Sequence, residues 1–224
     1  EGGVSRRHTS SRGVVAGLWL GMTLVLFTST NAGAQPVELS LAPTSMPKVG
    51  TVDARFQAYN VEMLEVTGGA FWKPYNSTAG ATSKPDASVP AGMDPSIYQY
   101  RPPLDLSHPR LRKLAAALGP AYVRVSGTWA NSTYFAESET PPAKVPAGFD
   151  GVLSQQQWRG VIDFVKAVDG KIVTSFATSP GTRDASGVWT SDHARRWVEF
   201  TKSIGGEIAA AEFMNEPSLA TMGG

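Results

Sequence analysis

The sequence of 224 residues contains no cysteine and only three histidines. The lack of cysteine excludes disulfides, thiolate metal sites and a cysteine nucleophile. The three histidines, His8, His108 and His193, are far apart, so no pair has the spacing of a zinc site. We therefore expect neither a metal ion nor a cofactor.

The charge balance also excludes several kinds of partner. Twenty basic and nineteen acidic residues give a net charge of +1. No strong electrostatic field therefore points to nucleic acid or to an anionic membrane. A Gly-x-Gly-x-x-Gly motif after the first expected strand and a Walker-type phosphate loop are both missing, which argues against dinucleotide or nucleotide binding.

A long hydrophobic run is missing as well. Residues 14–27 are apolar and follow three arginines, and a small-residue triplet ends at Ala34. This order is typical of a secretory signal, whereas a transmembrane helix, the alternative, needs roughly 20 apolar residues. We expect a signal peptide over residues 1–34, cleaved near Ala34, and an irregular leading segment over residues 35–54. The protein is then secreted or periplasmic, without a stable membrane anchor after cleavage.

Strand and helix patterns alternate along the rest of the chain. Strands are expected at residues 55–66, 121–127, 171–178 and 208–215, and helices at residues 107–119, 154–170 and 190–206. This alternation predicts an α/β fold of parallel strands with crossover helices. A doubly wound sheet and a (β/α)8 barrel both fit. A barrel needs eight strands and about 250 residues, so residues 55–224 would be its truncated first half, about four βα units.

Several local features refine this expectation. Ser107 and Ser154 are the expected N-caps of the first two helices, and Leu111, Leu114 and Leu118 form an apolar stripe on the first. Residues 72–105 are rich in Pro, Gly, Ser and Asp and are expected to form a long loop. We expect His193, near the start of the third helix, to lie on the surface.

Polar side chains follow the expected strands. Asn60 and Glu62 end the first strand, and Ser126, Gly127, Thr128 and Trp129 follow the second. Asn215 and Glu216 end the fourth. In a βα barrel the chemistry takes place at the carboxyl ends of the strands. Polar groups beside an aromatic platform suit a sugar, which offers hydroxyls to bind and C–H faces to stack on.

The tripeptide Asn215-Glu216-Pro217 follows an apolar strand. We expect the Glu216 carboxyl to be partly withdrawn from water, so that it holds a proton for a leaving glycosidic oxygen. Pro217 favours an extended backbone at Glu216. The alternative interpretation is an ordinary turn at the exit of a strand.

Three segments together resemble glycoside hydrolase family 79, the heparanase and β-glucuronidase family of clan A. They are YNVEM at 59–63, VRVSGTWANSTYF at 123–135 and AAEFMNEPS at 210–218. The resemblance implies that Glu216 is the proton donor and later the base. It also implies that Asn215 reaches the 2-hydroxyl, and that Glu62, Gly127 and Thr128 bind substrate. Ser126 stands where relatives often have glycine.

This resemblance implies a (β/α)8 enzyme that hydrolyses β-glucuronide linkages of oligo- or polysaccharides with retention of configuration. A retaining mechanism needs a second carboxylate about 5–5.5 Å from the first. In the family it is a glutamate on a later strand, which we expect beyond Gly224, so the chain alone should be inactive. The alternatives are another clan A glycosidase, for β-xylosides or arabinosides, and a carbohydrate-binding barrel relic without catalysis.

Two further interpretations concern neighbouring side chains. Glu212 is expected to pair with Arg124, most simply as a buried structural ion pair. Trp129 is expected either to stack on a sugar ring or to pack within its loop. Phe71, Trp72 and Tyr75 are expected to anchor their loop to the body of the protein.

Overall fold

The computed structural model describes residues 39–74 and 95–218, in two units that divide between Lys48 and Val49. In the first unit, residues 39–48 contain the 3-10 helix η1 (Pro43–Ser45), and all of them are exposed. The predicted signal peptide lies outside the described residues. Within the described ranges, no helix is long and apolar enough to cross a membrane.

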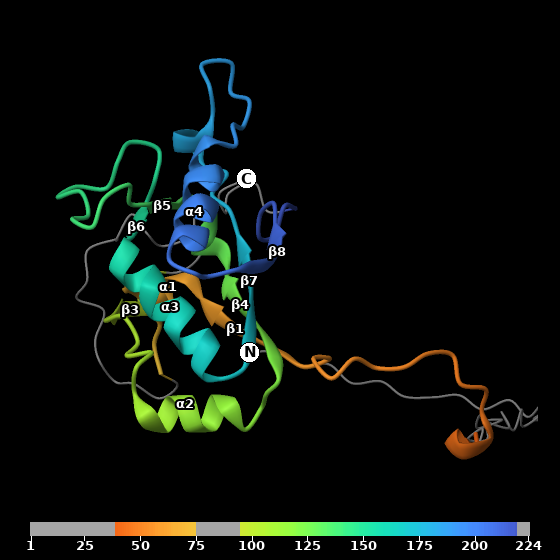
Figure 1. Ribbon diagram of the computed structural model, residues 1–224. Coiled ribbons are helices and arrows are strands. Elements are labelled where there is room, and N and C mark those ends of the chain that lie inside the picture. The colour runs from red at the N-terminus through yellow and green to blue at the C-terminus, as the bar shows by residue number, and fades with distance from the viewer. Residues whose placement is uncertain (1–38, 75–94, 219–224) are drawn as a thin grey trace, which may run out of the picture. The chain divides into compact units, whose positions relative to one another are not determined.

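The second unit contains a parallel sheet of four strands in the order β1-β4-β7-β8 (Figure 1). These strands are β1 (Ala58–Glu62), β4 (Ala121–Ser126), β7 (Gly170–Ser175) and β8 (Ile208–Glu212). Three helices lie in the connections between them: α2 (Pro109–Ala116), α3 (Gln155–Ala167) and α4 (Asp192–Ser203). The predicted α/β fold with parallel strands is confirmed.

One face of this sheet packs against α3 and α4, which lie on the same side of it in Figure 1. Ser154 caps α3 as predicted, because its Oγ accepts a hydrogen bond from the Gln157 N–H at 3.1 Å. The expected apolar face of α3 is buried against strand side chains such as Val123 and Val125. That helix face consists of Trp158, Ile162 and Val165.

Two small sheets flank the main one. Strands β2 (Gly69–Trp72) and β3 (Tyr98–Arg101) pair antiparallel, and β5 (Thr133–Phe135) pairs parallel with β6 (Gly151–Leu153). The prediction of a continuous loop over residues 72–105 is therefore wrong at its ends, although residues 75–94 lie outside the described part. The polar composition hid β3, which forms because Tyr98 is buried and stacks on Trp72 with ring centroids 4.9 Å apart.

The first strand is shorter than predicted. β1 ends at Glu62, and helix α1 (Met63–Thr67) replaces the second half of the strand expected over residues 55–66. One contact that stabilises this helix is local: the Glu62 N–H donates to Oε2 of Glu65 at 2.9 Å, which satisfies a donor at the start of the helix. Burial of Met63, Leu64 and Val66 then fixes the turn against the core.

Helix α2 begins two residues later than predicted, and His108 is its N-cap instead of Ser107. The Ser107 hydroxyl donates to Oδ1 of Asp105 at 2.5 Å, so it is already engaged. The His108 Nδ1 accepts a hydrogen bond from the Arg110 N–H at 3.2 Å. The histidine ring therefore supplies the acceptor that a serine was expected to supply.

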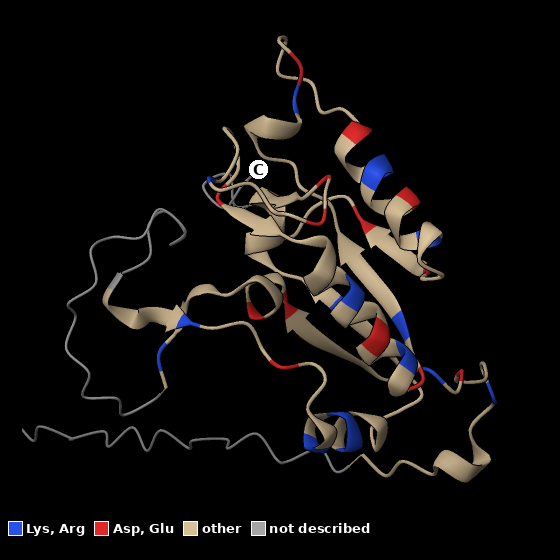
Figure 2. Cartoon of the chain, turned by 60° about the vertical axis from the view of Figure 1, so that its left-hand side comes forward, with Lys and Arg blue, Asp and Glu red and all other residues tan. Residues whose placement is uncertain are grey.

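The leucine stripe of α2 is only partly buried. Leu111 packs against the core, but Leu114 and Leu118 are 60% and 52% exposed. Both line an open groove of about 460 Å³ between α2 and β1. Three other positions of α2 are basic, and the helix contains no acidic residue (Figure 2); they are Arg110, Arg112 and Lys113.

His193 is buried, so the prediction of a surface residue is wrong. Its side chain reaches the second small sheet, where Nε2 accepts a hydrogen bond from the Phe135 N–H at 2.7 Å. The ring also lies against the rings of Tyr134 and Phe149. Burial, followed by the nearby Arg196 charge, lowers the pKa of His193 to about 4, against the opposing effect of Glu137. The sequence gives no indication that a single histidine in the first turn of a helix is buried.

His193 should make the fold sensitive to acid. Its pKa is lower in the folded state than the ordinary 6.5, so the unfolded chain binds the proton first as the pH falls. The stabilisation is complete above about pH 6.5 and is lost as the pH falls toward 4, by about 3 kcal/mol in all. We expect the free energy of unfolding of His193→Asn, measured with urea, to lack this acid-dependent loss. An unchanged slope between pH 7 and pH 4 in the variant would contradict the assignment.

Candidate active site

Polar side chains gather at the carboxyl edge of the parallel sheet. β8 ends at Glu212, not at Asn215 as predicted, so Asn215 and Glu216 lie on a turn just after the strand. A hydrogen-bonded network still joins this turn to the ends of β1 and β4. Its members are Asn60, Glu62, Arg124, Ser126, Thr128, Asn131, Ser175, Glu212, Asn215 and Glu216.

The predicted pair of Arg124 and Glu212 is formed. Arg124 Nε donates to Glu212 Oε1 at 2.6 Å and Nη2 donates to Oε2 at 2.7 Å, a two-point geometry with high directional specificity. Their side chains are 28% and 35% exposed, so the pair is half-buried and not fully buried as expected. The Arg124 hydrogen bonds lower the pKa of Glu212, and a hydrogen bond from Ser175 at 3.0 Å adds to this.

The Arg124 guanidinium also binds side chains on both sides of the site. Nη1 of Arg124 donates to Asn60 Oδ1 at 2.7 Å, and Nη2 donates to Asn215 Oδ1 at 2.9 Å. Asn60 in turn donates from Nδ2 to Glu62 Oε1 at 2.6 Å. One cation therefore orients the amide groups that stand beside the Glu62 and Glu216 carboxyl groups.

The Glu216 carboxylate is held through one of its two oxygens. Thr128 Oγ1 donates to Oε2 at 2.8 Å and Asn215 Nδ2 donates to the same oxygen at 3.1 Å. The other oxygen, Oε1, has no hydrogen-bond partner within residues 39–74 and 95–218. The structure thus brings together three of the predicted site residues. The side chain is exposed, however, so the expected partial withdrawal of Glu216 from water is wrong for this chain.

The backbone at Glu216 is left-handed, with φ of 49°, so the predicted extended conformation is also wrong. A non-glycine residue in this region stores about 1–3 kcal/mol and persists only where its surroundings hold it. Here Thr128 and Asn215 bind the side chain. Their bonds outweigh the preference that Pro217 imposes on the residue before it.

Glu62 lies half-buried on the other side of the network. Burial raises the pKa of its carboxyl, and the neighbouring Glu65 and Glu216 carboxylates add to the rise. The hydrogen bond from Asn60 and the charge of Arg124 oppose this rise. Burial is the largest of these effects, so Glu62 holds its proton to a higher pH than a free glutamate does.

Gly127 makes room for Glu62. Its φ is 100°, a conformation that side chains rarely adopt. A Cβ built on Gly127 would lie 1.6 Å from Glu62 Oε2, well inside a van der Waals contact. The glycine is therefore part of the site because it leaves the space that the carboxyl group of Glu62 occupies.

Trp129 packs within the flanking structure. Its ring lies edge-on to Phe71, with centroids 5.3 Å apart, and to Tyr98 at 6.4 Å. This geometry favours the loop-packing interpretation over sugar stacking. Phe71 and Trp72 belong to β2, and the contact of Phe71 with Trp129 anchors that strand next to the site, whereas Tyr75 lies outside the described residues.

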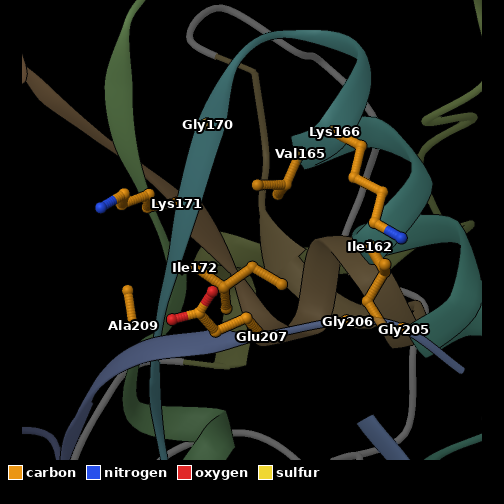
Figure 3. Close-up of a pocket in the computed structure, with 10 residues that line it drawn as sticks. All are labelled: Ile162, Val165, Lys166, Gly170, Lys171, Ile172, Gly205, Gly206, Glu207 and Ala209. Carbon is orange, nitrogen blue, oxygen red and sulfur yellow. The ribbon is translucent and has the colours of Figure 1, made fainter. Parts of the chain in front are cut away.

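The opposite end of the sheet has a separate cavity of about 200 Å³ (Figure 3). Its wall includes Gly170 and Lys171 from the start of β7 and Glu207, which precedes β8. It therefore lies at the amino ends of these strands, away from Asn215 and Glu216. Among the described residues, no group of three or more His, Asp or Glu side chains is placed to hold a metal ion.

Sequence reasoning missed two members of the network, Asn131 and Ser175. Asn131 occurs in the sequence only within the segment expected after the second strand, and Ser175 only within the third expected strand. Ser175 of β7 is paired in register with Glu212 of β8. Alternation along the two strands therefore places both side chains on the same face of the sheet. No sequence signal indicates that Asn131 would reach the turn after β8.

No protein-family model matches the chain, and no curated protein matches it.

Gly127→Ala should lower the free energy of unfolding by at least about 2 kcal/mol, because the new methyl group needs a strained backbone and displaces Glu62. In a double-mutant cycle, Glu62→Ala should recover part of the loss by removing the overlap. The matched control is Gly160→Ala within α3, where a Cβ meets open space and should stabilise the helix by about 0.5–1 kcal/mol. Urea unfolding measures all four variants. Additive effects at positions 62 and 127 would refute the steric account.

Proposed function

We propose that this protein is a glycoside hydrolase in which Glu216 is the general acid and base. The observation that carries the proposal is the convergence of Thr128 and Asn215 on Oε2 of Glu216. Two donors on one oxygen fix the direction of the carboxyl group and leave Oε1 to exchange a proton with a ligand. The location, at the carboxyl edge of a parallel sheet, is where α/β enzymes place their reactive groups.

The proposed reaction moves one proton in each of two steps. In the first, protonated Glu216 donates its proton to the glycosidic oxygen as the C–O bond breaks, and the alcohol leaves. A second carboxylate forms a bond to the anomeric carbon. In the second step Glu216 accepts a proton from water while that water replaces the carboxylate. By the family resemblance, the second carboxylate is a glutamate on a later strand.

The groups around Glu216 suit this chemistry. Burial raises the pKa of the Glu62 carboxyl group, which can accept a hydrogen bond from a sugar hydroxyl. A sugar bound over Thr128 and Asn215 would displace water from the exposed Glu216 carboxyl group.

The substrate class rests on the sequence motifs. Arg124 already makes two hydrogen bonds to Glu212, so its guanidinium is not free to bind the carboxylate of a glucuronate. The geometry therefore supports hydrolysis of glycosides in general and does not select glucuronides. The resemblance to family 79 favours β-glucuronides over β-xylosides and arabinosides. It also supports a (β/α)8 barrel, of which the four parallel strands would be one part, and the expected signal peptide supports export.

Glu216→Gln in the full-length protein tests the role of the acid. We expect turnover of an alkyl β-glucuronide, whose leaving group needs a proton, to fall by about 10²–10⁴-fold. The first step on 4-nitrophenyl β-glucuronide should be largely retained, because that leaving group departs without a proton. Glu139→Gln, an exposed glutamate away from the site, is the matched control and should behave as the unchanged protein.

Equal losses on both substrates would argue against Glu216 as the acid. Binding of glucuronides without hydrolysis by the unchanged protein would favour the carbohydrate-binding alternative. Faster hydrolysis of 4-nitrophenyl β-xyloside than of the glucuronide would retain the mechanism and change the substrate class.

A further inference from the structure

Asn131 is a buried carboxamide next to the proposed site. It belongs to the 3-10 helix η3 (Thr128–Ser132), which follows β4 through Gly127. Its side chain is fully buried, so its polar atoms need partners within the protein. Because η3 also contains Thr128, a shift of Asn131 would move one of the two groups that hold Glu216.

The Asn131 carboxamide binds both main-chain groups of Asn215. Asn131 Nδ2 donates to the Asn215 carbonyl oxygen at 2.9 Å, and the Asn215 N–H donates to Asn131 Oδ1 at 2.9 Å. The two bonds close a ring, as paired residues do between neighbouring strands. A side chain thus takes the place of a strand neighbour for the turn that follows β8.

The main chain of Asn131 adds a third connection. Its carbonyl oxygen accepts hydrogen bonds from the N–H groups of Thr178 at 2.9 Å and Ser179 at 3.0 Å, beyond the end of β7. One residue therefore joins the segments that follow β4, β7 and β8. Thr128 comes from the first of these segments, and Asn215 and Glu216 come from the last.

We propose that Asn131 is a positioning residue that sets the direction of the Glu216 carboxyl group by holding the backbone of Asn215. Asn215 is then fixed at its main chain by Asn131 and at its side chain by Arg124, so its Nδ2 donates to Glu216 in a defined direction. The left-handed backbone at Glu216 needs such a hold. Asn131 itself touches no reacting atom. This inference rests on the proposed function of Glu216.

Asn131→Asp separates positioning from folding. The two side chains have nearly the same shape, and aspartate still accepts from the Asn215 N–H. An ionised aspartate, however, places an oxygen against the Asn215 carbonyl where Nδ2 donated before. A protonated aspartate donates there again and closes the ring. The defect of this variant should therefore diminish as the pH falls, whereas the unchanged protein has no such titration at position 131.

The experiment compares two leaving groups in the full-length protein. With Asn131→Asp at neutral pH, we expect kcat for an alkyl β-glucuronide to fall about 10–100-fold with little change in KM, since small displacements of a catalytic group cost this much. The fall for the first step on 4-nitrophenyl β-glucuronide should be much smaller. Lowering the pH should raise the ratio of variant to unchanged kcat.

The control is a buried hydroxyl far from Glu216. Thr201 Oγ1 accepts from Trp158 Nε1 at 2.8 Å and donates to the Trp197 carbonyl at 2.8 Å. Thr201→Val should destabilise the fold and lower both activities in the same proportion. The same pattern in Asn131→Asp, with no pH-dependent recovery, would overturn the positioning role while leaving the proposed function in place.

Other outcomes separate the two proposals. If Glu216→Gln retains full activity on the alkyl glycoside, the proposed function fails and the inference fails with it. Hydrogen exchange of the unchanged protein provides a test that needs neither activity nor a folded variant. The Asn215 amide should be protected, and exchange there as fast as in an unstructured peptide would refute the ring of hydrogen bonds.

Discussion

The guanidinium of Arg124 is the interaction on which the carboxyl edge depends. It makes four hydrogen bonds, to side chains from β1, from β8 and from the turn after β8. A half-buried charge of this kind is stable only while its counter-charge is in place, because either partner alone would lose water without compensation. Arg124 therefore holds the ends of these strands next to one another, and the side chains of the proposed site are arranged around its guanidinium.

This arrangement divides the sheet into two chemically different faces. One face carries Val123, Val125 and Ile172, which pack against the helices. The stabilisation on that face comes from the burial of apolar surface. Arg124 and Glu212 lie on the other face, where the energy comes from hydrogen bonds and opposite charges. Alternation along each strand separates the two sets. A substitution on one face leaves the other face in contact with the same neighbours.

The fold was predictable from patterns that act over short distances. Period-two and helical repeats located the four parallel strands and the three connecting helices, and Ser154 was identified as an N-cap because its bonding partner is three residues away. Three of the misses depend, at least in part, on partners that are distant in the sequence. α1 forms because its apolar residues find the core, β3 because Tyr98 finds Trp72, and His193 is buried because Phe135 offers a backbone donor.

The candidate site was predictable to a similar degree. Glu62, Gly127, Thr128, Asn215 and Glu216 were identified because the carboxyl ends of parallel strands meet at one edge. The conformation at Glu216 was not, since Pro217 argued for an extended backbone and contacts with residues 128 and 215 decided otherwise. Asn131 lies 84 residues from its partner Asn215 in the sequence, and a local sequence pattern does not indicate a contact over that separation.

The strand order has a consequence for how the protein is assembled. β1, β4, β7 and β8 are adjacent in the sheet in the same order in which they occur in the chain. During synthesis each new strand can therefore add to an edge that already exists, with no need to insert between two earlier strands. Pairing can then follow the direction of translation, because each strand of this sheet pairs with the strand of the sheet that precedes it in the chain. The polar edge is complete only when the last of these strands arrives.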